Sequence, residues 1–306
     1  MLLQKAIALY LDDWKLPVIT DYHLGLFVFR MHQEKIYRGR PITINKSVPE
    51  ISDFRLLLKK CLSDGILNIN KDFSGRVVFN ILGASNSPAE DIACTVNPFA
   101  YMSHLSAMDY HGLTDRNPLT LYISSPSPSQ WKHFAAERMK KDLRENFFDY
   151  RETGFPLLKK ILLKKVNKRP IHCFSSLHLG SYRNIKDRPL RVATIGKTFL
   201  DMLRDPNLCG GVEHVLDVYQ EHAQDYLDLI VEEIHQHGKP IDKIRAGYIL
   251  NELLGVSHPL ITQWETFIQR GGSRKLDASG DYAPVYSKKW RLSINTIKER
   301  TKRANN

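Results

Sequence analysis

Paired cysteines and long apolar runs are both missing from this sequence. Its four cysteines, at positions 61, 94, 173 and 209, form no C-x-x-C pair, which excludes zinc ribbons and thioredoxin-type redox motifs. No stretch approaches the roughly 18 to 20 uncharged apolar residues of a membrane span. The first fifteen residues lack the small-residue cleavage site of a secretory leader. We therefore expect a reduced, cytoplasmic chain that has no membrane partner.

Metal, triad and nucleotide motifs are incomplete as well. The histidines between 214 and 237 lie among acidic residues without H-E-x-x-H or H-x-x-x-H spacing. Ser103 and His104 are hydrolytic residue types, but no nucleophile elbow surrounds them. The Gly196-Lys197-Thr198 run imitates the end of a phosphate-binding loop, yet Arg191 stands where that loop needs glycine. We expect no metal, no cofactor and no enzyme, with a nucleotide-dependent enzyme as the alternative.

The sequence has fewer acidic than basic residues. The 306 residues hold 44 Lys and Arg against 33 Asp and Glu, which gives a net charge of +11. Residues 101–200 hold 18 basic and 8 acidic residues, whereas 201–265 hold 4 and 12. With 42% hydrophobic and 25% charged residues the chain has the composition of a folded protein. A cationic folded chain is expected to bind a polyanion, and nucleic acid is the first candidate.

The N-terminal pattern favours a DNA-binding fold. Apolar spacing predicts helices over 2–13, 21–33 and 49–63, followed by a β-hairpin with strands 66–69 and 76–81. This order is typical of a winged helix-turn-helix, whose last helix enters the major groove while the hairpin tip follows a phosphate backbone. A 15-residue connection separates the second and third helices, where the usual turn has about three to four residues. A plain helical subdomain with a hairpin is the alternative.

Candidate DNA contacts follow from that arrangement. They lie on the exposed side of the third helix, in the hairpin and in the long connection. Cationic side chains there would contact phosphates. The residues are Ser52, Arg55, Lys59, Lys60, Lys71, Arg76, Arg38 and Arg40.

The short polar run Ser85–Pro88 interrupts the chain, and the sequence pattern changes after it. We therefore predict a domain boundary after residue 86. The sequence thus predicts an α+β protein with a winged helix-turn-helix over 1–86 and a second domain over 87–306. We expect that domain to comprise an α/β part over 87–195, a helical bundle over 196–270 and a basic tail over 271–306. The expected helices are 98–111, 131–148, 197–204, 211–223, 226–237, 240–254 and 260–269, and the expected strands are 119–123, 171–174 and 190–194.

A basic stretch over 130–170 raises the possibility of RNA binding. Aromatic residues interleave with its charges, as in proteins that stack single-stranded bases. Core packing is the alternative role of such side chains, and it is the one we favour. The aromatic residues are Trp131, Phe134, Phe147, Phe148 and Tyr150.

Two segments about ninety residues apart resemble one known family. The first, Tyr101–Thr114, fits the pattern S-H-x-S-A-x-x-x-H-G-L. The second, Val192–Leu203, fits [EK]-[RK]-T-[LF]-L-D-x-L with Gly196 in place of the charged first residue, and a Gly-Gly pair follows at 210–211. On these segments the chain resembles the AbiEi family of abortive-infection antitoxins. The motif residues that we single out are Ser103, His104, His111, Lys197, Thr198 and Asp201.

The resemblance implies an antitoxin of a bacterial type IV toxin–antitoxin system that acts in phage defence. An N-terminal domain would bind inverted repeats in double-stranded promoter DNA and repress transcription. The C-terminal domain would counter a cognate nucleotidyltransferase-like toxin, by direct contact or indirectly. The alternatives are a stand-alone transcriptional regulator and a nucleotide-dependent enzyme or kinase that modifies a partner toxin.

Overall fold

The computed structural model describes residues 1–306 except 45, 47, 84–86, 177–178, 270–273 and 297–306. Helices, antiparallel hairpins and a mixed sheet follow one another along the chain, so the predicted α+β class is confirmed. The chain forms two compact units. Unit 1 comprises residues 1–100, 124–178 and 184–190, and unit 2 comprises 101–123, 179–183 and 191–306.

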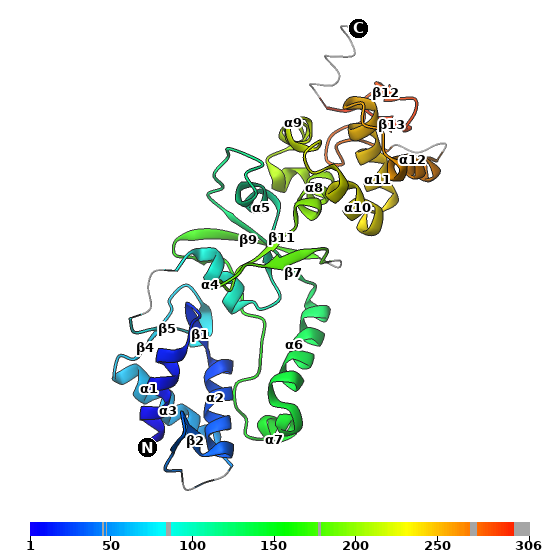
Figure 1. Ribbon diagram of the computed structural model, residues 1–306. Helices are drawn as coiled ribbons and strands as arrows, with labels where there is room; N and C mark the ends of the chain where they lie inside the picture. The colour runs from blue at the N-terminus through cyan, green and yellow to red at the C-terminus, as the bar shows by residue number, and fades with distance from the viewer. Residues whose placement is uncertain (45, 47, 84–86, 177–178, 270–273, 297–306) are drawn as a thin grey trace. The chain divides into compact units, whose positions relative to one another are not determined.

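Unit 1 is built around α2 (Asp21–Glu34), which is capped at both ends. Thr20 Oγ1 accepts a hydrogen bond from the His23 amide at 3.4 Å, and Lys35 ends the helix in the left-handed conformation with φ of 54°. Such caps satisfy backbone groups that a helix leaves unpaired. α1 (Leu3–Asp13) and α3 (Ile51–Ser63) share one apolar core with α2 (Figure 1).

A three-stranded antiparallel sheet completes this core. Its order is β1 (Val18–Thr20), β5 (Val78–Ile81), β4 (Leu67–Ile69). Ile19 and Ile69 both lie opposite Phe79 in the register, and Ile19 and Phe79 are fully buried. The predicted hairpin is therefore confirmed. β1 is an addition, because no strand was expected between the first and second helices.

The rest of unit 1 packs onto α2 from later in the chain. α6 (Pro128–Leu143) supplies Met139 and Leu143, and α7 (Phe147–Glu152) supplies Tyr150, all to the core of α2. The Tyr22 hydroxyl donates a hydrogen bond to Asp142 Oδ2 at 3.1 Å. The remaining elements of the unit are β2 (Ile36–Tyr37), β3 (Arg40–Pro41), α4 (Ala89–Val96), β8 (Lys165–Val166), β9 (Arg169–Ser176) and the second half of β7 (Leu121–Pro126).

Unit 2 begins with short elements and continues as packed helices. β6 (Tyr101–Met102) pairs in parallel with β11 (Arg191–Ala193), and Met102 lies opposite Val192. Thr194 Oγ1 accepts a hydrogen bond from the Lys197 amide at 3.3 Å and so caps the first of the C-terminal helices. The other elements are α5 (His104–Tyr110), β10 (Tyr182–Asn184, whose last residue lies in unit 1), α8 (Ile195–Arg204), α9 (Val212–His222), α10 (Leu227–His237), α11 (Pro240–Gly247), α12 (Pro259–Trp264), β12 (Tyr286–Ser287) and β13 (Leu292–Ser293).

Four predicted helices differ from the observed ones. The helix expected over 131–148 is divided into α6, which ends at Leu143, a 3-10 turn over Arg144–Asn146, and α7, which begins at Phe147. Within the range 98–111, where one helix was expected, the structure has the strand β6 followed by the short helix α5, and α4 ends before this range at Val96. Pairing of Met102 with β11 imposes extended backbone there, and tertiary pairing overrides local periodicity. The helix expected over 240–254 stops being α-helical at Gly247 and continues as a π-helical segment over Tyr248–Leu253. The helix expected over 260–269 is α-helical only to Trp264.

The boundaries of the two compact units differ from the single boundary expected after residue 86. The reason is that α4, α6 and α7 pack with the N-terminal elements. Residues 84–86 themselves lie outside the described part of the structure, as do 270–273 and 297–306 of the predicted basic tail. No helix in the described part of the chain is both long and apolar enough to cross a membrane.

The packing of unit 1 can be tested at Gly25, which Tyr150 and Pro156 approach closely. A Cβ atom at Gly25 would lie 2.6 Å from Tyr150 Oη and 3.3 Å from Pro156 Cδ. We expect Gly25→Leu to lower the free energy of unfolding by about 1–3 kcal/mol through overpacking, measured by urea denaturation of the full chain. Gln33→Leu, at an exposed position of the same helix, should stay within about 0.5 kcal/mol of wild type. Equal stability of the two variants would contradict this packing.

Candidate functional site

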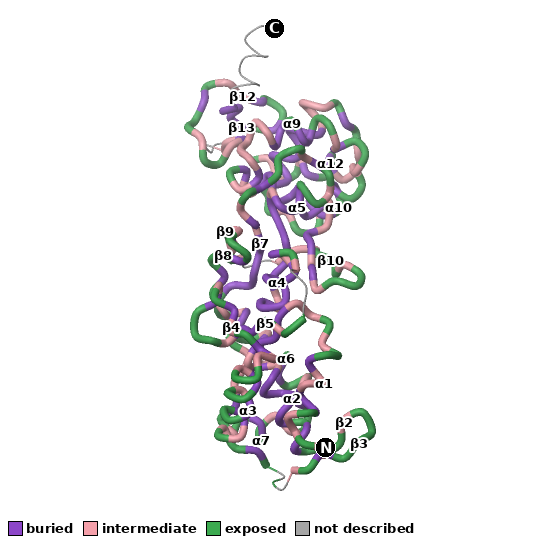
Figure 2. The backbone as a smooth tube through the Cα atoms, turned by 90° about the vertical axis from the view of Figure 1, so that its left-hand side faces the viewer, coloured by how far each residue is buried: buried purple, intermediate pink, exposed green. Residues whose placement is uncertain are grey.

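The outer side of α3 is one continuous exposed surface. Ser52, Arg55, Lys59 and Lys60 are exposed, while Phe54, Leu57 and Cys61 are buried beneath them (Figure 2). Residues three or four apart share a face of a helix, so the four exposed side chains lie together. We call this surface, with Leu56, the α3 face. Leu56, which the sequence pattern did not single out, is 70% exposed in the middle of the face.

The cations of the α3 face are free of carboxylates. None of Arg55, Lys59 and Lys60 forms an ion pair or a side-chain hydrogen bond with another residue that the structure describes. The nearby Asp53 is occupied elsewhere, because its carboxylate accepts a hydrogen bond from the Glu50 amide at 2.8 Å as part of a capping box. The face therefore presents uncompensated positive charge.

The β4–β5 connection lies next to α3 in the chain and is held in place at its tip. Lys71 and Arg76 are exposed there, as predicted. Asp72 accepts a hydrogen bond from the Asn167 amide at 2.8 Å, so the turn between β8 and β9 supports the tip. Arg76 has φ of 52°, an uncommon conformation for a residue other than glycine. Both cations are thus carried by an ordered turn.

The two remaining predicted contacts, Arg38 and Arg40, lie in the β2–β3 hairpin but have different surroundings. Arg38 pairs with Asp13, whose Oδ2 accepts from Arg38 Nε at 2.9 Å and from the Tyr37 hydroxyl at 2.7 Å. The hydrogen bond from Arg38 lowers the pKa of Asp13 and keeps its carboxylate charged. Arg38 thus differs from the cations of the α3 face in having a carboxylate partner, and its contact with a phosphate stays a prediction. Arg40 is exposed.

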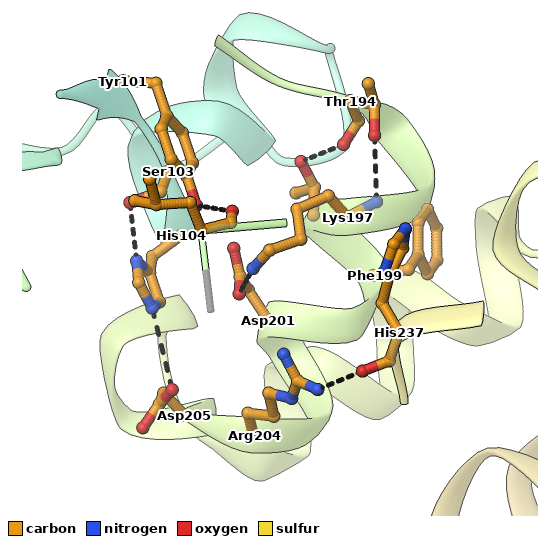
Figure 3. Close-up of polar contacts among 12 residues, drawn as sticks. Tyr101, Ser103, His104, Thr194, Lys197, Phe199, Asp201, Arg204, Asp205 and His237 are labelled. Atoms are coloured by element: carbon orange, nitrogen blue, oxygen red, sulfur yellow. Dashed lines mark hydrogen bonds and ion pairs between the residues drawn. The ribbon is translucent and has the colours of Figure 1, made fainter. Parts of the chain in front are cut away.

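The family motifs meet inside unit 2 (Figure 3). His104 Nδ1 lies 2.8 Å from Ser103 Oγ, and His104 Nε2 lies 3.9 Å from Asp205 Oδ2. Ser103 and His104 are fully buried. His104 has φ of 50°, a strained conformation that surrounding packing must maintain. Asp205 was not found from the sequence, because 101 residues separate it from His104 and no spacing rule connects them.

The second motif forms a buried ion pair one helical turn long. Lys197 Nζ and Asp201 Oδ1 are paired within α8, with side chains 4% and 5% exposed. Thr198 Oγ1 donates a hydrogen bond to the Thr194 carbonyl at 2.9 Å. Gly180 lies directly against the Lys197 side chain, where any Cβ atom would collide with it. A buried pair of this kind is costly to break, because one charge would remain uncompensated.

His111 ties the end of α5 to β11. Its Nε2 lies 2.8 Å from the Ala193 carbonyl oxygen, and burial lowers the pKa of the imidazole. All six motif residues therefore lie in one unit and act as internal framework around α5, β11 and α8. Because Ser103 is fully buried, the arrangement of serine, histidine and aspartate presents no nucleophile to a substrate.

Two other sequence patterns also have structural roles. Gly196 packs against α10, since a Cβ atom there would collide with the Leu229 carbonyl. Together with the Lys197–Asp201 pair, this contact argues against a phosphate site at the start of α8. His214 Nε2 lies 2.9 Å from Thr114 Oγ1, and His235 Nδ1 accepts from Trp264 Nε1 at 3.4 Å. In the described part of the chain, no three His, Cys, Asp or Glu side chains are grouped so that they could hold a metal ion.

Comparison of the whole chain with protein-family models and with curated proteins finds no match. The resemblance to AbiEi antitoxins thus remains one of short motifs.

The Lys197–Asp201 pair can be tested by a mutational cycle. Lys197→Met alone leaves a buried carboxylate without its partner and should cost about 3–5 kcal/mol of the free energy of unfolding, while the double variant Lys197→Met/Asp201→Leu should recover most of it. The exposed pair of Lys46 and Glu50, also four residues apart at 2.9 Å, is the control. There Lys46→Met should cost less than about 1 kcal/mol. If calorimetric unfolding finds Lys197→Met as stable as the double variant, the buried ion pair is disproved.

Proposed function

We propose that the chain binds double-stranded DNA through unit 1 and represses its own promoter. The observation that carries this proposal is the α3 face, where Arg55, Lys59 and Lys60 are exposed, adjacent and unpaired with carboxylates. Arg and Lys side chains in this arrangement neutralise DNA phosphates and release counterions. The chain would use α3 as its recognition helix.

The order of elements supports the same conclusion. Three helices precede the β4–β5 hairpin, as in a winged helix-turn-helix. The hairpin follows α3 after three residues, and it carries Lys71 and Arg76 in the connection between its strands. The β2–β3 hairpin accounts for the long connection between α2 and α3. In this proposal the connection is an insertion into the winged helix-turn-helix.

Leu56 would add base recognition to the phosphate contacts. An apolar side chain in the major groove contacts the methyl group of thymine, and Arg can read guanine through two hydrogen bonds. Leu56 and Arg55 are neighbours on the α3 face. The expected readout is therefore a short element that contains thymine and guanine.

Charge reversal on α3 tests DNA binding. Arg55→Glu/Lys59→Glu should weaken binding to a 30-base-pair duplex from the chain's own promoter by at least about 100-fold at physiological salt, because two phosphate contacts become repulsive. The slope of log K against log salt should also fall by about 0.9 for each lost contact. The matched control is Lys140→Glu/Lys141→Glu on α6, which changes the net charge by the same amount. Equal affinities of the two double variants in gel-shift titrations would reject α3 as the interface.

We further propose that unit 2 belongs to an antitoxin of the AbiE type, which opposes a nucleotidyltransferase-like toxin in phage defence. The motif resemblance from Ser103 to Leu113 and from Lys197 to Leu203 supports this assignment. In such a protein the buried motif residues would stabilise unit 2, and its surface would act against the toxin.

Co-expression separates the two proposed activities. The full chain, produced with the neighbouring gene of its operon, should restore growth and silence a promoter reporter. The Arg55→Glu/Lys59→Glu variant should still restore growth while repression is lost, because the altered side chains lie in unit 1. If the full chain represses but neither protein restores growth, it is a transcriptional regulator only and the antitoxin assignment is wrong.

A further inference from the structure

Unit 1 contains an apolar groove that the proposed DNA contacts do not use. The groove encloses about 490 Å³ between α6, α7 and residues 157–160. Its floor is buried and its walls are half-buried, so it is a recess rather than a flat surface. The floor is formed by Trp131, Ala135 and Met139, and the walls by Ala136, Phe147, Leu157 and Leu158.

Four exposed cations surround this apolar recess. They are Lys132, Arg151, Lys159 and Lys160, and no carboxylate lines the groove. The Arg151 guanidinium lies over the Phe147 ring at 5.7 Å from its centroid, and Lys160 Nζ donates to the Pro126 carbonyl at 3.4 Å. None of the four forms an ion pair with a residue in the described part of the chain. Their charge remains available to a ligand.

The size and the charge of the groove identify one class of occupant. Small-molecule sites usually measure about 300–1,000 Å³, with mainly apolar lining and a few charged groups that fix the ligand's orientation. We propose that this groove binds a small apolar organic anion, an aliphatic or aromatic skeleton that carries a carboxylate. The skeleton lies on Trp131 and Met139, and the carboxylate is held by Lys132 and Lys159 at the rim.

Single-stranded nucleic acid fits the groove less well, although cations and aromatic residues meet there. Binding of that kind needs exposed aromatic faces on which bases can stack. Trp131 is only 4% exposed, and its Nε1 donates to Asn97 Oδ1 at 3.0 Å. Tyr150 is fully buried, and the exposed Phe148 does not line the groove. Trp131 and Tyr150 are therefore core residues.

An occupant would stabilise unit 1 as a whole. Met139 belongs to the core that contains α2, and Phe147, Leu157 and Leu158 pack against that core. A ligand that binds only the folded state raises the midpoint of unfolding in proportion to the logarithm of its concentration. Binding thus has a readout that does not depend on DNA.

Calorimetric titration of the full chain with dodecanoate, below its micelle concentration, tests the proposal. We expect saturable binding at one site and a rise of the unfolding temperature, with no binding of acetate and weaker binding of dodecanol. Lys132→Glu/Lys159→Glu should reduce the affinity for dodecanoate at least about tenfold, because the charge-assisted contacts become repulsive. Ala136→Trp, which fills the recess from a half-buried position, should abolish binding.

Lys141→Glu is the matched control, because Lys141 is exposed on the same helix but does not line the groove. It should bind dodecanoate like the wild type. Absence of saturable dodecanoate binding would overturn the proposal, and so would equal affinity of the wild type and the folded Ala136→Trp variant. If a ten-residue oligothymidine binds, dodecanoate does not, and the rim variant loses oligothymidine binding, the groove is a single-strand site and the proposal is wrong.

Discussion

Unit 1 depends on the burial of α2. Tyr22, Leu24 and most of the residues through His32 are buried, so the helix has to be covered on nearly every side. A helix with apolar residues on most of its sides is stable only when other elements cover those sides. α1, α3 and the β1–β5–β4 sheet cover part of α2, and α6 and α7, from much later in the chain, cover the rest. This constraint joins the N-terminal elements to residues 124–178 in one core.

The same packing decides which surfaces of unit 1 are left for function. α3 uses Phe54, Leu57 and Cys61 to cover α2, and its opposite side remains exposed with its cations. α6 covers α2 with Met139 and Leu143, and Met139 also forms part of the floor of the apolar groove. The α3 face is therefore the outer side of an amphipathic helix, whereas the groove adjoins the core and shares Met139 with it.

The charged side chains discussed above form largely buried ion pairs in unit 2 but are exposed in unit 1. In unit 2, Lys197 is buried against Asp201, and Arg204 Nε donates to Asp242 Oδ2 at 2.9 Å. These pairs stabilise the folded state only as complete pairs, because desolvation makes a lone buried charge expensive. In unit 1 the cations of the α3 face and of the groove rim remain exposed without ion pairs. Residues of the same type thus form framework in one unit and candidate binding surface in the other.

Local sequence determined much of unit 1. Apolar spacing was sufficient to predict three helices and a hairpin, as well as the exposure of Arg55 and Lys59. Only the tertiary structure decided that α6 and α7 complete the N-terminal core, that Arg38 is neutralised by Asp13, and that His104 lies near Asp205. Helix periodicity and capping depend on neighbours within a few residues, whereas burial and ion pairing depend on partners that the chain brings together only when it folds.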